Sequence, residues 1–337
     1  SEIKKLRAGE FDEKMLEANI NNFKLYELQS MESNEGRADI FVNSFINGTN
    51  WEDEVTAIDR MAKLTKEDIV AFADKYLKED NYAVVYKKQG KDPNEKKMTK
   101  PEITPIVSNR DVASPFLTSI QENAVKPIEP VFLDFKKDMS QLTAKSDIPV
   151  LYKQNTTNDL FQLIYVFDMG NNNDKALGTA FDYLEYLGTS DMTPEELKSE
   201  FYRLACTFYV SPGNERTYVV LSGLNENMPA AMQLFEKLLA DAQVNKEAYN
   251  NLVGDILKAR ADAKLNQGQN FSRLMNYAMY GPKSPATNLL TEAELASMNP
   301  QELVDRIHNQ NNYKHRILYY GPSSSKDLLA TIDQYHQ

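Results

Sequence analysis

The sequence contains a single cysteine, Cys206, so no disulfide bond can form within the chain. Cys206 lies in a run that reads as helical, and we expect it to be a small buried apolar residue rather than a nucleophile. Histidine is almost as scarce, because His308, His315 and His336 are the only three. Their spacing matches no common metal-binding pattern, so histidine-based chemistry has little support.

Positive charge is also in short supply. The chain carries 38 Lys and Arg against 49 Asp and Glu, a net charge of −11, with no basic stripe interleaved with aromatics. Nucleic acids and anionic membranes are bound mainly through their phosphates, so neither is an expected partner. No apolar run approaches the ~18 residues of a membrane span. A glycine-rich phosphate loop and a G-x-S-x-G turn are both missing, which argues against nucleotide binding and serine hydrolysis.

The length of 337 residues predicts about two domains of ~150 residues each. Residues 1–90 read as helices followed by one strand. Thr65 is a helix N-cap with Asp68 three residues on, and Tyr82–Tyr86 is rich in β-forming residues. We therefore expect a helical layer with a closing strand.

Residues 91–130 contain six of the fourteen prolines and show little periodicity. Proline removes a backbone donor and disfavours regular structure, so we expect an extended connector between two domains.

Residues 131–337 read as a second unit of alternating strands and helices. Residues 150–152 and 160–167 are predicted to be neighbouring strands, and 216–221 a further strand. Helices are expected near 177–186, from the cap at Thr193, and over 230–242, 246–265 and 268–280. The predicted fold class is α/β (α+β), a mainly antiparallel sheet packed with helices.

The end of the second unit repeats the end of the first. Thr65 and Asn299 each cap an amphipathic helix, and residues 82–86 and 316–320 follow in the same relation. The helix that opens after Phe11 corresponds in the same way to the one that opens after Val244. This order indicates two similar α/β modules, the first lacking its start.

The helix near 177–186 carries a degenerate motif. The pattern H-x-x-E-H places two imidazoles and one carboxylate on one helical face, and here those positions hold Asp182, Glu185 and Tyr186. The alternative interpretation is an ordinary amphipathic helix, with Leu177, Ala180, Phe181 and Leu184 buried and the three motif residues solvated.

Taken with the repeat, this motif resembles the pitrilysin/insulinase family of zinc metallopeptidases, the inverted zincins. The resemblance implies paired α/β modules closing around a peptide chamber. According to this resemblance, residues 1–90 are the end of a second module. Residues 91–130 are then the linker between the two halves, and residues 131–337 form a third module. Residues 320–329 are expected to begin a further one. The intact catalytic module would lie outside this chain.

The departures from the family pattern bear on function. Asp182 could replace a histidine ligand, but the phenol of Tyr186 is a poor ligand for zinc. The third ligand, a glutamate in the family, should fall near residues 258–263, where Asp262 is the only candidate. We therefore expect no metal in this chain and zinc in the catalytic module. Glu185, the general base of active relatives, is expected to be structural here.

The resemblance implies a non-catalytic segment that helps form the peptide-binding chamber. Its partners would be the remaining modules and a peptide substrate, with Arg216 and Tyr218 on the strand that faces it. A proteolytically inactive scaffold or interaction subunit is the alternative, and an enzyme of another class has no supporting residues. The charged N-terminus has no signal-peptide core. If the parent is bacterial and exported, the cell envelope or periplasm is expected.

Limited proteolysis should cut first between Gly90 and Pro130. Few buried contacts are expected there, so little free energy opposes local opening. Mass spectrometry of the early fragments identifies the first cleavage site. First cuts within 175–265, with the connector intact, would contradict these domain boundaries.

Overall fold

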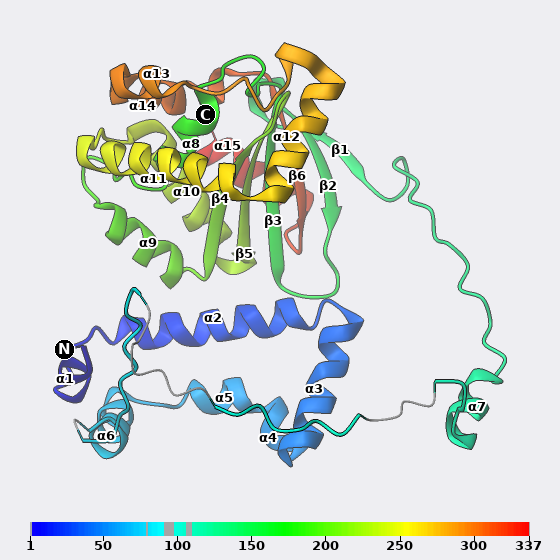
Figure 1. Ribbon diagram of the computed structural model, residues 1–337. Coiled ribbons are helices and arrows are strands. Elements are labelled where there is room, and N and C mark those ends of the chain that lie inside the picture. The colour runs from blue at the N-terminus through cyan, green and yellow to red at the C-terminus, as the bar shows by residue number, and fades with distance from the viewer. Residues whose placement is uncertain (1, 79, 91–97, 106–109, 337) are drawn as a thin grey trace.

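A computed structural model describes residues 2–78, 80–90, 98–105 and 110–336. Figure 1 shows a sheet with helices packed beside it, a helical N-terminal region below, and a connector that leaves this body on an extended path. No helix among the described residues is long and apolar enough to cross a membrane.

The described part of the N-terminal region contains six helices and no strand. They are α1 (Glu2–Arg7), α2 (Lys14–Ser30), α3 (Asn34–Asn47), α4 (Trp51–Val55), α5 (Ala57–Met61) and α6 (Lys66–Tyr76). The predicted cap of α6 is confirmed: Thr65 Oγ1 accepts the Asp68 N–H at 3.2 Å, and Asp68 Oδ2 accepts the Thr65 N–H at 3.0 Å. Large apolar side chains on α3 and α6, among them Phe45 and Phe72, are exposed.

The predicted strand at Tyr82–Tyr86 is wrong. These residues are irregular and exposed, and the described residues before 140 contain no strand that could pair with them. A β-rich sequence needs a partner strand to satisfy its backbone, so the local pattern alone could not form one.

The connector is not wholly extended. Pro115–Gln121 form helix α7, which Ser114 caps and Pro115 opens at a position where its missing N–H costs nothing. Residues 91–97 and 106–109, on which part of the connector prediction rests, lie outside the described residues.

The second region holds a six-stranded sheet in the order β1-β2-β6-β3-β5-β4. The strands are β1 (Ser140–Thr143), β2 (Pro149–Gln154), β3 (Leu160–Phe167), β4 (Cys206–Pro212), β5 (Thr217–Leu224) and β6 (His315–Gly321). All neighbours are antiparallel except β2 and β6. The predicted pairing of β2 with β3 is wrong, because β6 from the chain's far end lies between them.

Helices form the other layer. They are α8 (Leu177–Leu184), α9 (Pro194–Arg203), α10 (Met228–Asp241), α11 (Lys246–Leu265), α12 (Gln267–Tyr280), α13 (Glu292–Ser297), α14 (Pro300–His308) and α15 (Ser325–Tyr335). The predicted Thr193 cap is confirmed, with Pro194 in the first turn and Glu196 closing a capping box. The predicted long helices are present within one or two residues.

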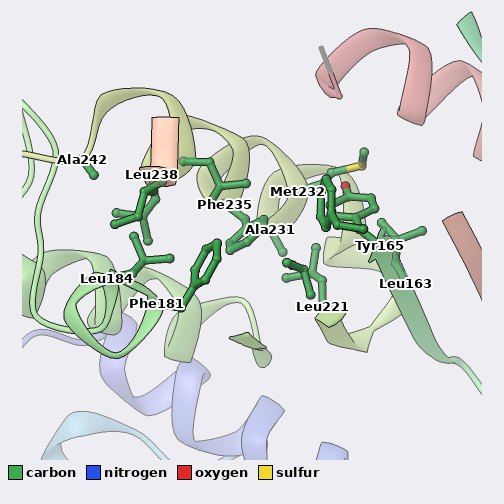
Figure 2. Packing of buried hydrophobic residues seen from close by; sticks show 14 of the residues in the cluster. Leu163, Tyr165, Phe181, Leu184, Leu221, Ala231, Met232, Phe235, Leu238 and Ala242 are labelled. Carbon is green, nitrogen blue, oxygen red and sulfur yellow. The ribbon is translucent and has the colours of Figure 1, made fainter. Parts of the chain in front are cut away.

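The core lies on one face of the sheet. Alternate residues of β3, including Leu163 and Tyr165, are buried against α8 and α10, as Figure 2 shows. Thr217, Val219 and Leu221 of β5 point the same way, as their alternation predicted. Burying each large apolar side chain contributes roughly 1.5–3 kcal/mol, so this face provides most of the module's stability.

Cys206 is buried as predicted, but it opens strand β4 instead of lying in a helix. Ala205, at φ 46°, turns the chain out of α9 just before it. Burial raises the pKa of the Cys206 thiol to about 12, so the reactive thiolate is disfavoured.

Helix α2 docks on the module although the connector separates them in sequence. The Asn22 side chain donates to Tyr202 O at 2.7 Å, and the Tyr202 hydroxyl donates to Asn19 Oδ1 at 2.6 Å. Leu25 packs with Leu160 and other residues in a small apolar cluster. Figure 1 shows α2 lying across the lower end of the sheet.

The expected start of a further module at residues 320–329 falls on β6 and α15. Strand β6 lies inside this sheet, and Leu328 and Ile332 of α15 join the core that α10 also fills. These residues therefore complete the module.

Replacing Gly223 by alanine should destabilise the module by about 2 kcal/mol or more. Gly223 has φ +150°, and an added Cβ would lie 2.3 Å from Ala205 O. The matched control is Gly254→Ala, because Gly254 lies in α11 with nothing within 4 Å of the new methyl. That change should stabilise by roughly 0.5–1 kcal/mol. Urea unfolding of both variants checks the pair, and equal effects would contradict this account of β4 and β5.

Candidate functional site

The degenerate motif lies at the C-terminal end of α8. Asp182 is in the last turn, Glu185 is the C-cap with helical backbone angles, and Tyr186 follows in a turn. All three side chains are exposed, whereas Tyr183 and Leu184 between them are buried. The three motif residues therefore do not share one face of a continuous helix, because α8 ends between Asp182 and Glu185.

The Glu185 carboxylate acts on that of Asp182. Partial removal of water by surrounding protein raises the pKa of the Asp182 carboxyl above its ordinary value, and the negative charge of Glu185 raises it further. The Lys198 ammonium lies 6.0 Å from the centre of the Tyr186 ring. The described part of the chain contains no group of three or more His, Cys, Asp or Glu side chains arranged to hold a metal ion.

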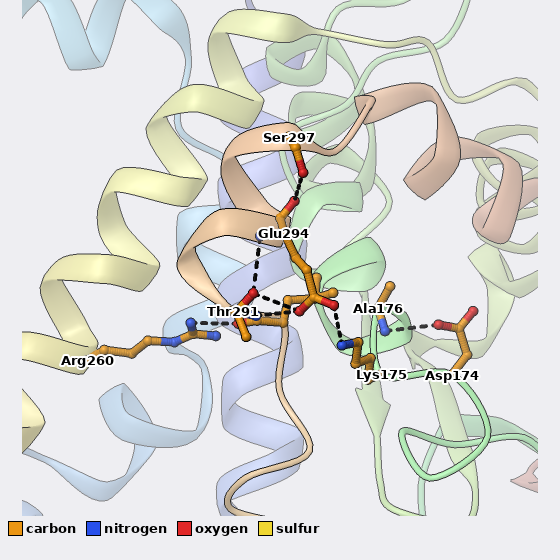
Figure 3. A network of polar contacts seen from close by, with 8 residues as sticks. Asp174, Lys175, Ala176, Arg260, Thr291, Glu294 and Ser297 are labelled. Atoms are coloured by element: carbon orange, nitrogen blue, oxygen red, sulfur yellow. Dashed lines mark hydrogen bonds and ion pairs between the residues drawn. The ribbon is translucent and has the colours of Figure 1, made fainter.

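The structure does not bring Asp262 to the motif. Helix α11 meets α8 near its own start, where the rings of Tyr183 and Tyr249 pack edge to face. Asp262 is 13 residues beyond Tyr249, roughly 20 Å along the helix axis, and is exposed. Arg260 in the same stretch instead donates to Leu290 O at 2.7 Å, beside the cap of α13 (Figure 3).

Figure 3 centres on Glu294, which links α13 to the segment before α8. Its carboxylate closes the capping box with Thr291 and pairs with Lys175. The Lys175 hydrogen bond, followed by those to Thr291, lowers the pKa of Glu294 to about 2. This network is therefore structural: it holds α13 against the loop that leads into the motif helix.

A cavity of about 480 Å³ lies beside the motif, between α2, α8, α9 and β4. Glu185 and Lys198 line it, together with Phe208 of β4 and Tyr26 of α2. Sequence reasoning missed both Phe208 and Tyr26. Strand β4 has only a weak alternating pattern, and no local signal could place α2 here.

Strand β4 forms one edge of the sheet. Gly213 N–H donates to Arg216 O, and Leu224 N–H donates to Ala205 O, so hydrogen-bonded pairs stand at both ends of the β4–β5 ladder. Alternation along the ladder then turns the N–H and C=O groups of Phe208 and Val210 away from β5. No hydrogen bond within the described ranges uses these groups.

The sheet face opposite the core carries an apolar stripe. The strand registers place Leu151, Leu318, Ile164, Val220 and Tyr209 side by side across five strands. More polar rows flank the stripe. This face is only partly covered, since Tyr209 is 51% exposed.

Arg216 and Tyr218 line one open cavity of about 550 Å³, which also includes Tyr280 from the end of α12. Arg216 Nε lies 3.5 Å from Asp168 Oδ1, and Tyr218 is 39% exposed. Strand β5 is inner, with β3 and β4 paired to its two edges. A peptide backbone therefore has no free edge of this strand to pair with, and a side-chain role for Arg216 and Tyr218 stays a prediction.

No family model matches the sequence, and neither does any curated protein. Solved structures with a similar fold include a peptidase M16 inactive domain from Pseudomonas fluorescens, with a TM-score of 0.51 and 16% identity over 59% of this chain and 50% of that one. The periplasmic protease PqqL from Escherichia coli has a TM-score of 0.51 and 12% identity over 96% of this chain and 40% of that one.

The ferredoxin protease FusC, solved as a mutant with Arabidopsis ferredoxin, has a TM-score of 0.52 and 10% identity over 99% of this chain and 40% of that one. The fold predicted from the resemblance is thus confirmed, because the chain is similar in structure to an M16 inactive domain and to two proteases. The chain spans half or less of the length of these three proteins.

The chain should not bind zinc more tightly than about 1 μM, because a catalytic site needs three protein ligands. Isothermal titration calorimetry at near-stoichiometric zinc measures this, and the chain alone should cleave no peptide. Asp182→Ala should leave the titration unchanged. Sub-micromolar binding that disappears in Asp182→Ala would overturn the prediction.

Proposed function

We propose that this chain is a non-catalytic segment of a zinc-dependent peptidase that forms part of a peptide-binding chamber. Hydrolysis would occur at a metal site in another module. The observation that carries the proposal is the free β4 edge, which runs beside a cavity and beside a motif that lacks its metal ligands.

The fold comparison supports the peptidase part of this proposal. The similar structures are an inactive M16 domain and two proteases, and this chain corresponds to half or less of each. A protein of that plan would supply the remaining modules as partners. Zinc would belong to the catalytic module.

The helix spacing supports a two-module origin. Helices α2, α3 and α6 start at residues 14, 34 and 66, and α11, α12 and α14 start at 246, 267 and 300. The offsets are 246 − 14 = 232, 267 − 34 = 233 and 300 − 66 = 234. The N-terminal helices would then be the second half of a preceding module.

The mechanism we propose is positioning. An extended peptide laid along β4 would receive hydrogen bonds from Phe208 and Val210, each contributing roughly 0.5–1.5 kcal/mol. Its side chains could enter the cavity near Glu185 or contact the stripe that ends at Tyr209. Binding of this kind fixes the peptide's orientation, and the bond chemistry stays with the catalytic module.

A scaffold or interaction subunit is the second candidate. The observation that favours it is the exposed apolar surface on α3 and α12, where Phe45, Phe271 and Leu274 are each more than half exposed. Patches of this kind mark interaction sites in soluble proteins. An intact H-x-x-E-H module elsewhere in the full protein favours the peptidase, whereas degenerate motifs throughout favour the scaffold.

Val210→Pro tests the β4 edge. It removes one outward N–H and leaves the ladder to β5 intact, because that N–H does not face β5. Binding of a fluorescein-labelled unfolded casein peptide, followed by anisotropy, should weaken roughly tenfold through the lost bond and the intruding ring.

The matched control is Gln141→Pro on the opposite edge. Ala144 N–H donates to Ile148 O, so alternation also turns the Gln141 N–H outward from β1. This variant should bind like the parent chain. Equal affinity of both variants and the parent chain for the peptide would show that the peptide does not pair with the β4 edge, and would contradict the proposed function.

A further inference from the structure

A row of buried polar side chains joins α10, β6 and the end of α15. Glu236 Oε1 lies 2.6 Å from His336 Nδ1, and His336 Nε2 lies 2.7 Å from His315 Nε2. His315 Nδ1 lies 2.7 Å from the carbonyl oxygen of Tyr313. His336 is 6% exposed and Glu236 9% exposed. Peptide binding, as proposed above, uses none of these residues.

The partners at the two outer ends determine where the protons are. A carboxylate and a backbone carbonyl can only accept hydrogen bonds, so Nδ1 of both His336 and His315 must donate. A neutral imidazole with its proton on Nδ1 has a lone pair on Nε2. Two neutral rings would therefore direct lone pairs at each other across 2.7 Å, which is repulsive. With Glu236 ionised, a positive species has to lie between the two Nε2 atoms.

We propose that His315 and His336 share one proton between their Nε2 atoms and that this proton, with Glu236, forms a pH-sensitive latch holding the end of α15 to α10 and β6. The separation favours a proton over a metal ion. Zinc–nitrogen bonds of 2.0–2.1 Å in tetrahedral geometry place two nitrogens about 3.3 Å apart. A shared proton fits 2.7 Å.

The surroundings accept one positive charge. Glu236 offers the opposite charge, and its other oxygen accepts from Asn311 Nδ2 at 2.9 Å. The Tyr165 ring stacks on His336 with 4.6 Å between centres. Its hydroxyl lies near Glu236 without a hydrogen bond of good geometry, and burial raises the pKa of Tyr165 well above its ordinary value. Tyr165 therefore stays neutral.

Three other charged groups on these elements are engaged elsewhere. Lys237 of α10 pairs with Asp191, and Arg316 of β6 pairs with Asp168. Asp333 of α15 accepts a hydrogen bond from the backbone of Lys145. Glu236 and Tyr165 are thus the titratable groups that the observed contacts place against the pair. A cavity of about 360 Å³ reaches Glu236 from outside and gives water a route to the latch.

The latch should hold best at intermediate pH. Burial, followed by the charge of His336, lowers the pKa of His315, so a second proton enters less readily than in an unfolded chain. Stability from this source is present above about pH 6.5 and is lost as the pH falls below it. At high pH the shared proton leaves, the lone pairs repel, and the carboxylate of Glu236 loses its counter-charge.

Nuclear magnetic resonance of the imidazole nitrogens tests the proposal directly, since the chain has only three histidines. Near neutral pH, both rings should carry a proton on Nδ1, and one further proton should couple to both Nε2 atoms. The two rings should titrate together, in two steps that belong to the pair and not to either ring alone. His315→Gln and His336→Gln should each abolish the shared-proton signal and increase amide exchange in the last turn of α15.

His308→Gln is the matched control, because His308 contacts Ala242 O and lies outside the row. It should leave the shared-proton signal intact. Independent titration of the two rings, or a ring with its only proton on Nε2, would show that the proposal is wrong. One equivalent of zinc should change neither the spectrum nor the melting temperature. A shift of both rings with a higher melting temperature would identify a metal site and overturn the latch.

Discussion

The one-sided packing of the sheet is the constraint on which the rest of the structure depends. Successive side chains along a strand point to opposite faces, so each strand divides its residues between the helical layer and the other face. Leu163 and Tyr165 of β3 and Val219 and Leu221 of β5 are committed to the helices. What they leave behind is an apolar stripe without a full covering layer. The free edge of β4 and the cavity beside Glu185 lie at the border of the sheet, where we propose that an extended peptide binds.

Features that depend on local chemistry could be predicted from the sequence. The caps at Thr65 and Thr193 were predicted correctly because a hydroxyl, a carboxylate three residues on and an apolar periodicity act within one helical turn. The alternation of Thr217, Val219 and Leu221 gave the buried face of β5 for the same reason. The fold class followed from the order of such elements.

Features that depend on distant partners could not be predicted. Nothing near β2 or β3 indicates that β6 enters between them, and a β-rich run such as Tyr82–Tyr86 remains irregular when no strand is there to pair with it. The degenerate motif was visible in the sequence because it is local. Its cavity was not, since Tyr26 comes from α2 and Phe208 from a strand with weak alternation. The histidine pair shows the same limit: His315 and His336 have no ligand spacing in sequence and meet only through the fold.

The docking of α2 has a consequence for how the two regions stay together. Its contact with the module rests on a small apolar cluster around Leu25 and a few hydrogen bonds at Asn22 and Tyr202. Two separate molecules would scarcely associate through so little surface. Here α2 and the module belong to one chain, which makes their contact intramolecular and raises its effective concentration. A contact too small to hold two separate molecules can therefore persist within this chain.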